Sequence, residues 1–294
     1  MILVTGGTGF VGPKVVHALR AEERPVRVLA RKPERHDRLR AWGCEVVTGD
    51  MTDADSLRLA VQGCDAVVHL VAILLGSREA FERVMVQGTR DLVAAAEEAG
   101  VTRFVLMSAL GTSEESKELT SYFRAKWEEE QVVKESRLEH VVFRPSFVFG
   151  RDGGILPQQI RIARFSPVTP VLSERRLQPI WVDDVAAFYA RALDTPADTN
   201  RTFDLVGPDR VSWAELHAAI RKLLGKRRLA FTVPPGLLKA GAAVGEIVPP
   251  LRGAKGGVEM LITADNVGDP TPAVETFGIR PISLEEQLRR AVSA

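Results

Sequence analysis

The sequence predicts a doubly wound parallel α/β sheet followed by a smaller C-terminal α+β lobe. Three observations support this fold class. Short apolar runs alternate with helix-like segments through the first half of the chain. A glycine-rich turn directly follows the first apolar run. The 294 residues are 45% hydrophobic and 26% charged, which is ordinary for a globular protein with a large core.

Each element of the first half follows from its pattern. The predicted strands are continuous apolar runs, as expected for parallel strands covered on both faces, at residues 1–4, 26–30, 45–48, 66–71, 103–107 and 140–144. The predicted helices carry apolar residues at helical spacing, at residues 13–21, 37–42, 54–62, 78–99 and 121–136. Gly100 is typical of the residue that ends a helix. This alternation favours right-handed βαβ units.

The pattern changes after Gly150, where prolines become frequent. Strand-like segments at 178–182 and 202–205 alternate with helix-like segments at 185–193 and 212–224. Asp183 and Asp184 precede the helix at 185, and we expect a carboxylate there to cap it, with a catalytic carboxylate as the alternative. We therefore expect one domain over residues 1–150 and a smaller lobe over residues 151–294. An exchange of chain segments between the two is left open.

Composition excludes several classes of protein. The net charge of +1 does not favour nucleic acid as a partner. Cys44 and Cys64 lack the spacing of a disulfide framework or a zinc site, and the histidines show no metal-ligand spacing. No secretory signal is visible, so we expect a cytoplasmic protein. Residues 236–251 form an apolar stretch, which we interpret as a packed helix, with contact to a membrane surface as the alternative.

The glycine turn has a spacing with a physical purpose. Gly6, Gly9 and Gly12 lie between a predicted strand and a predicted helix. The first glycine permits a tight turn, the second lets backbone amides approach a pyrophosphate, and the third lets the helix pack closely on the strand. The helix N-terminus then presents free N–H groups to an anion. We expect a Rossmann-type dinucleotide site, and the alternative is a turn without a ligand.

The end of the second strand indicates which dinucleotide binds. A carboxylate at this place would hold the ribose hydroxyls of NAD, but the sequence has Ala30 followed by Arg31. A guanidinium can hold a 2′-phosphate with two hydrogen bonds. NADP(H) is therefore favoured over NAD(H). The alternative is that Arg31 is a solvated loop residue.

Tyr122 and Lys126 are the candidate catalytic residues. They are four residues apart in a predicted helix and so share a face. A lysine beside a tyrosine should lower the pKa of the phenol, which could then exchange the proton that accompanies hydride transfer at a carbonyl carbon. The other tyrosine, Tyr189, lies in a predicted buried helix.

These motifs resemble the extended branch of the short-chain dehydrogenase/reductase superfamily over most of the chain. Gly49-Asp50, the run 66–72, Phe143–Gly150 and Pro179–Ala186 match further segments of that branch. The resemblance implies that Asp50 contacts adenine and that Lys126 holds the nicotinamide ribose. It also implies a set of further cofactor-binding residues, namely Thr8, Phe10, Val11, Met51, Val71, Ala72, Ser108 and Pro145.

Two departures from that family's pattern bear on activity. Ala109 stands where the family has a catalytic serine or threonine. Ser108 is its neighbour, but side chains alternate along a strand, so the side of the sheet to which Ser108 points is left open. Met85 stands where the family has an asparagine. This combination resembles the atypical extended members similar to the NADPH-binding accessory subunit of respiratory complex I.

Two functions follow from these residues. The first is an NADP-dependent oxidoreductase or a nucleotide-sugar epimerase/dehydratase that uses Tyr122 and Lys126 on an unknown small molecule. The second is a non-catalytic NADP(H)-binding module in electron transport or quinone metabolism, with a respiratory or peripheral membrane partner. A set of arginines could clamp a substrate diphosphate or simply be solvated: Arg161, Arg164, Arg175 and Arg176. Either a monomer or a homodimer paired through the helices at 78–99 and 121–136 is expected.

Overall fold

The computed structural model of the protein describes residues 1–166, 168–171, 175–194, 200–226, 229–232 and 265–293. The predicted apolar helix at 236–251 lies outside these ranges. Among the described residues, no helix has the length and apolar character needed to cross a bilayer.

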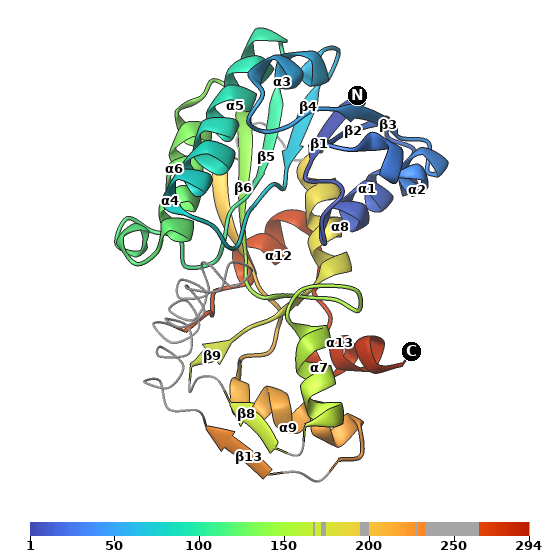
Figure 1. Ribbon diagram of the computed structural model, residues 1–294, viewed down its shortest axis with the longest axis vertical. Helices are drawn as coiled ribbons and strands as arrows, with labels where there is room; N and C mark the ends of the chain where they lie inside the picture. Colours follow the sequence, from blue (N-terminus) through green and yellow to red (C-terminus); the bar gives the residue numbers. More distant parts are fainter. Residues whose placement is uncertain (167, 172–174, 195–199, 227–228, 233–264, 294) are drawn as a thin grey trace.

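A seven-stranded parallel sheet forms the upper half of the molecule (Figure 1). Its strands are β1 (Ile2–Thr5), β2 (Val26–Ala30), β3 (Glu45–Thr48), β4 (Ala66–His69), β5 (Arg103–Met107), β6 (Glu139–Pro145) and β11 (Arg201–Leu205). Their order across the sheet is β11-β6-β5-β4-β1-β2-β3, with every neighbouring pair parallel. The order reverses at β1, and ligands of such sheets bind at the carboxyl ends of the strands beside this reversal.

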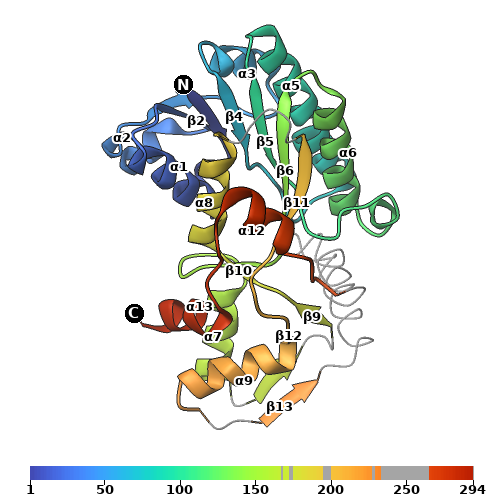
Figure 2. The same cartoon turned by 180° about the vertical axis from the view of Figure 1, so that it is seen from behind.

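The strands alternate their side chains between two apolar layers. Leu3 belongs to one layer and Val4 to the other, and the same alternation separates Phe104 from Val105. The first layer lies under α3 (Ala54–Val61), α5 (Gly88–Glu98) and α6 (Ser121–Glu135). The opposite face carries α1 (Gly12–Ala21), α8 (Val182–Ala192) and α12 (Thr271–Phe277), which are seen together in Figure 2. The predicted doubly wound sheet is confirmed.

The predicted helix at 78–99 is continuous, but its winding changes along its length. It starts as α4 (Arg78–Phe81), continues as a π-helix, η2 (Glu82–Gln87), and becomes α5. Gly100 follows its end with φ of +76°, a conformation that glycine adopts without strain. The remaining elements of this half are short: η1 (Pro33–Arg35), α2 (Asp37–Ala41) and η3 (Ser116–Glu118).

The lower half is built from α7 (Leu156–Phe165), α9 (Trp213–Leu223), α13 (Leu284–Val292) and three two-stranded sheets (Figure 1). The three sheets pair β7 (Val148–Phe149) with β10 (Ile180–Trp181), β9 (Arg176–Leu177) with β12 (Val211–Ser212), and β8 (Val168–Val171) with β13 (Leu229–Thr232). The chain beyond residue 150 also supplies β11, α8 and α12 to the large sheet. Segments of the second half therefore complete the core of the first.

The expectations for residues 178–193 were partly wrong. The strand is limited to Ile180–Trp181, and the helix begins at Val182 rather than at 185. No side chain caps it: Asp183 accepts a hydrogen bond from Trp181 Nε1, and Asp184 accepts one from the amide of Ile282. Both carboxylates lie in the first helical turn, where their negative charge interacts favourably with the positive end of the helix dipole.

An aromatic cluster joins the late segments to the sheet. The ring of Phe143 on β6 lies 5.0 Å from Tyr189 and 6.2 Å from Phe188, both on α8. It lies 6.2 Å from Phe203 on β11 and 5.3 Å from Phe277 on α12. Because Phe143 is fully buried and touches three other elements, it connects the C-terminal segment to the nucleotide-binding half.

Phe143→Ala should therefore be strongly destabilising. We expect a loss of about 3–5 kcal/mol in the free energy of unfolding, since a buried ring leaves a cavity that its rigid neighbours cannot fill. Urea denaturation followed by circular dichroism measures it. Phe165→Ala is the matched control, because that ring is 72% exposed, and it should change stability by no more than about 0.5 kcal/mol.

Candidate functional site

The glycine turn brings the start of α1 against the end of β1. Gly6 has φ of +73°, and a Cβ there would lie 2.8 Å from the carbonyl carbon of Leu70. A Cβ on Gly12 would lie 2.2 Å from the carbonyl oxygen of Gly6. Neither position can hold a side chain without moving the backbone. The first and third glycines of the motif thus act as the spacing predicts.

The outer side of the turn is open to a ligand. Thr8 and Gly9 are exposed, and a Cβ on Gly9 would meet nothing closer than 3.4 Å. No side chain caps α1, and its first turn contains no acidic residue. Its N-terminal amides and the positive end of its dipole are therefore available to an anion such as a pyrophosphate.

Phe10 and Val11 serve the turn in another way. A Cβ at Gly150, Gly153 or Gly154 would lie within 3.1 Å of the ring of Phe10, so the loop after β7 packs directly on this ring. Val11 is buried in the apolar layer beneath α1. Both side chains are thus engaged by the fold, and only their backbone groups remain for a cofactor.

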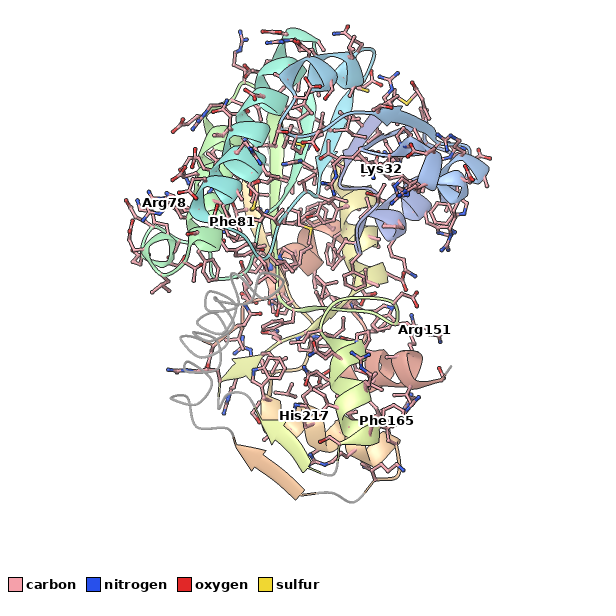
Figure 3. The ribbon with its side chains drawn as sticks, in the orientation of Figure 1. Lys32, Arg78, Phe81, Arg151, Phe165 and His217 are labelled. Carbon is pink, nitrogen blue, oxygen red and sulfur yellow. The ribbon has the colours of Figure 1, made fainter. Side chains whose placement is uncertain are left out.

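The adenosine end of the expected site carries positive charge. Arg31 follows β2, and both Arg31 and Lys32, labelled in Figure 3, are exposed. Burial works to raise the pKa of Asp50, but hydrogen bonds from Thr52 and the nearby charges of Arg31 and Arg83 outweigh it, and the pKa is lowered. Arg83, on η2, was not singled out from the sequence because it lies 52 residues from Arg31. Asp50 is followed by buried Met51.

The other end of the site contains Tyr122 in an apolar setting. Its half-buried ring packs, like Ile73, against a buried apolar cluster, and its centroid lies 6.4 Å from that of Phe81 and 5.8 Å from that of Phe123. In Figure 3, Phe81 lies on the left side of the upper half and Lys32 on its right side. No side chain or backbone group in the described part of the chain forms a hydrogen bond with the Tyr122 hydroxyl. A ligand could therefore accept a hydrogen bond from it.

Lys126 is held by a carboxylate that the sequence analysis missed. Its Nζ lies 2.9 Å from Glu129 Oε2 and donates to the carbonyl of Met107, at the end of β5, over 2.7 Å. Lys126 is 1% exposed and Glu129 is fully buried. Within the described residues nothing accepts the third ammonium proton, which leaves it for a ligand hydroxyl. The spacing of three residues on one helix is the signal that could have revealed Glu129.

The expected effect of Lys126 on Tyr122 was wrong. Burial raises the pKa of the Tyr122 phenol, and the negative charge of Glu129 raises it further. The physical reason is that burial disfavours the phenolate, while the charge of Lys126, which would favour it, is offset by its ion pair with Glu129.

Glu129 also ends a buried chain of hydrogen bonds. Thr89 Oγ1 donates to Glu129 Oε1 over 3.0 Å, so its oxygen accepts from His69 Nε2, also at 3.0 Å. His69 Nδ1 is then the acceptor for Thr5 Oγ1, at 2.5 Å. Burial lowers the pKa of His69 despite the opposing effect of Glu129, which keeps the ring neutral. His69 is thus a core histidine with a hydrogen-bond partner for each ring nitrogen.

The hydroxyl of Ser108 is bound to a carboxylate of α6. It donates to Glu130 Oε1 over 2.6 Å, and Arg144 binds both oxygens of Glu130 at 2.7 Å. Burial works to raise the pKa of Glu130, but hydrogen bonds from Arg144, Lys134 and Ser108 outweigh it. The hydroxyl of Ser108 is therefore committed to the fold. Ala109 beside it is buried and cannot replace it.

Other predicted residues lie along the same edge or apart from it. Val71 and Ala72 follow β4, and the amide of Val71 is 2.9 Å from the position of a Cβ on Gly6. The carbonyl of Pro145 accepts from the amide of Leu110. Arg161 and Arg164 lie on α7 in the lower half, and Arg175 and Arg176 lie at β9. In the described part of the chain, no group of three or more histidine, cysteine or acidic residues could bind a metal ion.

A family comparison agrees with this geometry. The sequence model of the NAD(P)H-binding family matches residues 6–196, which contain the glycine turn, Arg31, Tyr122 and Lys126. The chain belongs to the NAD(P)H-binding family. Its fold is that of solved short-chain dehydrogenase/reductase and epimerase structures, as the resemblance implied.

Two relatives illustrate the range of this NAD(P)H-binding family. A ceramide reductase of Caulobacter vibrioides is 32% identical over 83% of this chain and 77% of its own. Subunit 9 of the NADH dehydrogenase (ubiquinone) 1 alpha subcomplex of Mus musculus, a mitochondrial protein, is 30% identical over 98% of this chain and 79% of its own. One is an enzyme by name and the other a subunit of a larger complex.

A solved structure shares the fold. The Citrobacter sp. triphenylmethane reductase complexed with NADP(H) superimposes with a TM-score of 0.80, covers 99% of each chain and is 18% identical. The residues of the present chain fit a nicotinamide dinucleotide: the open glycine turn would receive the pyrophosphate, and the free proton of Lys126 would meet a ribose hydroxyl.

Gly12→Ala should weaken nucleotide binding and the fold together. The new methyl group would have to displace the first turn of α1 from the Gly6 carbonyl, and we expect a loss of about 1–3 kcal/mol in stability with at least about tenfold weaker binding. Fluorescence titration with NADPH and thermal denaturation measure the two effects.

Gly9→Ala provides the comparison. Its methyl group meets no protein atom closer than 3.4 Å, so the free protein should keep its stability while binding falls, because the methyl group projects into the expected pyrophosphate site. Unchanged stability and affinity in Gly12→Ala would contradict this account of the turn.

Proposed function

We propose that the protein is an NADPH-dependent reductase of apolar carbonyl compounds. The observation that carries this proposal is the unengaged hydroxyl of Tyr122 among apolar side chains, one helical turn from a lysine with a free proton. A phenol in this position can donate a proton to a carbonyl oxygen. Two of the proteins compared above are reductases by name, which supports the same class of reaction.

Each residue has a defined part in the proposed reaction. Bound NADPH supplies a hydride to the carbonyl carbon. Tyr122 gives its proton to the carbonyl oxygen as the C=O double bond becomes a C–O single bond, and the phenolate regains a proton from water. Lys126 orients the ribose, and Arg31 binds the 2′-phosphate. The products are an alcohol and NADP⁺, so atoms and charge balance.

The apolar side chains around Tyr122 indicate the character of the substrate. Phe81 lies beside the ring, and Ile73 packs against the same apolar cluster. The loop that continues from Ile73 contains Leu74 and Leu75, which are 69% and 47% exposed. Leu119, three residues before Tyr122, is 46% exposed. Exposed leucines beside a reacting group are suited to an apolar substrate, whose binding would remove them from water.

A non-catalytic NADP(H)-binding module is the second candidate. The observation that favours it is the commitment of Ser108 to Glu130, which leaves Tyr122 without a hydroxyl partner of the kind the family uses. A similarity to a subunit of NADH dehydrogenase is consistent with this candidate. In that case the nucleotide would stabilise the protein for contact with a partner.

Tyr122→Phe tests the reductase. NADPH oxidation at 340 nm is followed with a panel of apolar aldehydes, ketones and quinones, and we expect the substitution to lower kcat by about 10²-fold or more, as for loss of a general acid, while NADPH affinity is retained. Tyr189→Phe is the matched control, because that ring is fully buried in α8. Tight NADPH binding without turnover of any compound would favour the non-catalytic module.

Arg31→Asp tests the nucleotide preference. A carboxylate repels a 2′-phosphate and can accept hydrogen bonds from ribose hydroxyls, so affinity for NADPH should fall by about tenfold or more relative to NADH. Isothermal titration calorimetry with both nucleotides measures the ratio of the dissociation constants. Arg38→Asp makes the same change of charge on α2, where Arg38 stacks on Trp42, and should leave the ratio unaltered. An unaltered ratio in Arg31→Asp would remove Arg31 from the 2′-phosphate site.

A further inference from the structure

A cavity of about 530 Å³ lies between α1, α2, α8 and the loop after β7, and the proposed reaction does not use it. These elements pack on the face of the sheet opposite to α6, which carries Tyr122 and Lys126. The volume is within the range of about 300–1,000 Å³ that pockets for small molecules occupy. We propose that this cavity is a second ligand site, which binds a small aromatic carboxylate beside the glycine turn.

The cavity adjoins the expected nucleotide site but is separate from it. Among the described residues, Gly9 and Phe10 are the only ones shared between its lining and the set predicted to bind the cofactor. Neither Arg31 nor Lys126, at the two ends of that set, lines the cavity. A ligand here would therefore lie next to the pyrophosphate position without occupying it. This inference does not depend on the proposed reductase function.

Part of the lining is apolar. Pro13 and Ala18 come from α1, and Val182 and Ala186 come from the first two turns of α8. Trp42 adds a half-buried aromatic ring. A flat apolar body in the cavity would remove these surfaces from water, and an aromatic ring could form an edge-to-face or offset contact with Trp42.

Arg38 brings a positive charge to the ring of Trp42. Its guanidinium carbon lies over that ring, 4.7 Å from the centroid. This contact uses none of the five N–H donors of the arginine. Within the described part of the chain, no group accepts a hydrogen bond from Arg38. A carboxylate in the cavity could therefore accept the two parallel hydrogen bonds that a guanidinium group offers.

Lys14 and Arg151 add two further cations, and each is held in position. Lys14 Nζ lies 3.2 Å from Asp183 Oδ1, and the other oxygen of Asp183 accepts from Trp181 Nε1. Arg151, labelled in Figure 3, donates through Nε and Nη2 to the carbonyl of Arg290, over 3.3 and 3.0 Å. Among the described residues, nothing further accepts from these two cations, so both keep donors for a ligand.

The balance of charge indicates the class of ligand. The described lining contains three cationic side chains and two carboxylates, which leaves one net positive charge when His17 is counted as neutral. Asp183 is already paired with Lys14, so Asp152 is the carboxylate that opposes an anion directly. One negative charge on an apolar body suits this lining. A phosphate dianion would exceed the net charge and leave the apolar surface in water, and a neutral ring would gain nothing from the cations.

Isothermal titration calorimetry with 2-naphthoate tests the site. The protein is titrated alone and when saturated with NADPH, and we expect one equivalent to bind in both states with a dissociation constant below about 1 mM. The neutral compound 2-naphthalenemethanol has the same rings and should bind at least about tenfold more weakly. Equal affinity for the two compounds, competitive displacement of 2-naphthoate by NADPH, or no binding of 2-naphthoate would each overturn the inference.

Arg38→Gln removes the proposed partner of the carboxylate. Because Arg38 is exposed, the fold should be kept, and the affinity for 2-naphthoate should fall by about tenfold or more. Arg40→Gln is the matched control, since Arg40 lies on the same helix but donates to the carbonyl of Pro33 and to Asp37 and does not line the cavity. Equal affinities in the two variants would contradict a site at Arg38.

Ala18→Leu locates the ligand. Ala18 is half-buried in the lining, so a leucine there would fill part of the cavity, and the affinity for 2-naphthoate should fall by at least about tenfold without a loss of thermal stability. Ala21→Leu, at the exposed end of α1, should bind 2-naphthoate as the unmodified protein does. A ligand beside Tyr122 would be insensitive to Ala18→Leu, so an unchanged affinity in that variant would place 2-naphthoate elsewhere and overturn the inference.

Discussion

The close contact between Gly12 and the Gly6 carbonyl, which leaves no room for a side chain, determines how the candidate nucleotide site is built. Gly12, at the start of α1, lies so close to the Gly6 carbonyl that a Cβ would be 2.2 Å from the oxygen. This contact directs the uncapped end of α1 toward the carboxyl edge of β1, where the strand order reverses. The pyrophosphate position follows from it, and with it the direction in which the rest of a dinucleotide must extend.

The strand order then separates the two ends of the cofactor. Arg31 follows β2 on one side of β1, and Met107, which holds Lys126, ends β5 on the other side beyond β4. Three strand spacings of about 4.8 Å separate β2 from β5, or about 14 Å. An extended ligand with an anionic adenosine end and a polar ribose at its other end suits this distance, and a small mononucleotide does not.

The sequence was sufficient where the information is local. The run 103–107 coincides with β5, and the glycine spacing predicted the contacts of Gly6 and Gly12, because both depend on residues within a few positions. The start of α8 was predicted at 185 rather than at Val182, because the burial of the residues that begin the helix is a tertiary effect. The pKa of Tyr122 was predicted with the wrong sign because its burial, and then the charge of Glu129, raise it. Burial is a tertiary effect, and Glu129 is held by Thr89 and His69, which lie 40 and 60 residues earlier in the chain. No local pattern reveals such partners.

The adjacent carboxylates Glu129 and Glu130 of α6 bind two different sets of side chains near the candidate site. Successive residues of a helix differ by about 100° in direction, so Glu129 and Glu130 face different neighbours. Glu130 anchors α6 to β6 through Arg144 and takes the hydroxyl of Ser108. Glu129 anchors the same helix to β4 and α5 through neutral donors and takes the charge of Lys126. Both anchors fix α6 on the sheet, and the helix in turn places Tyr122 beside the apolar cluster that contains Phe81.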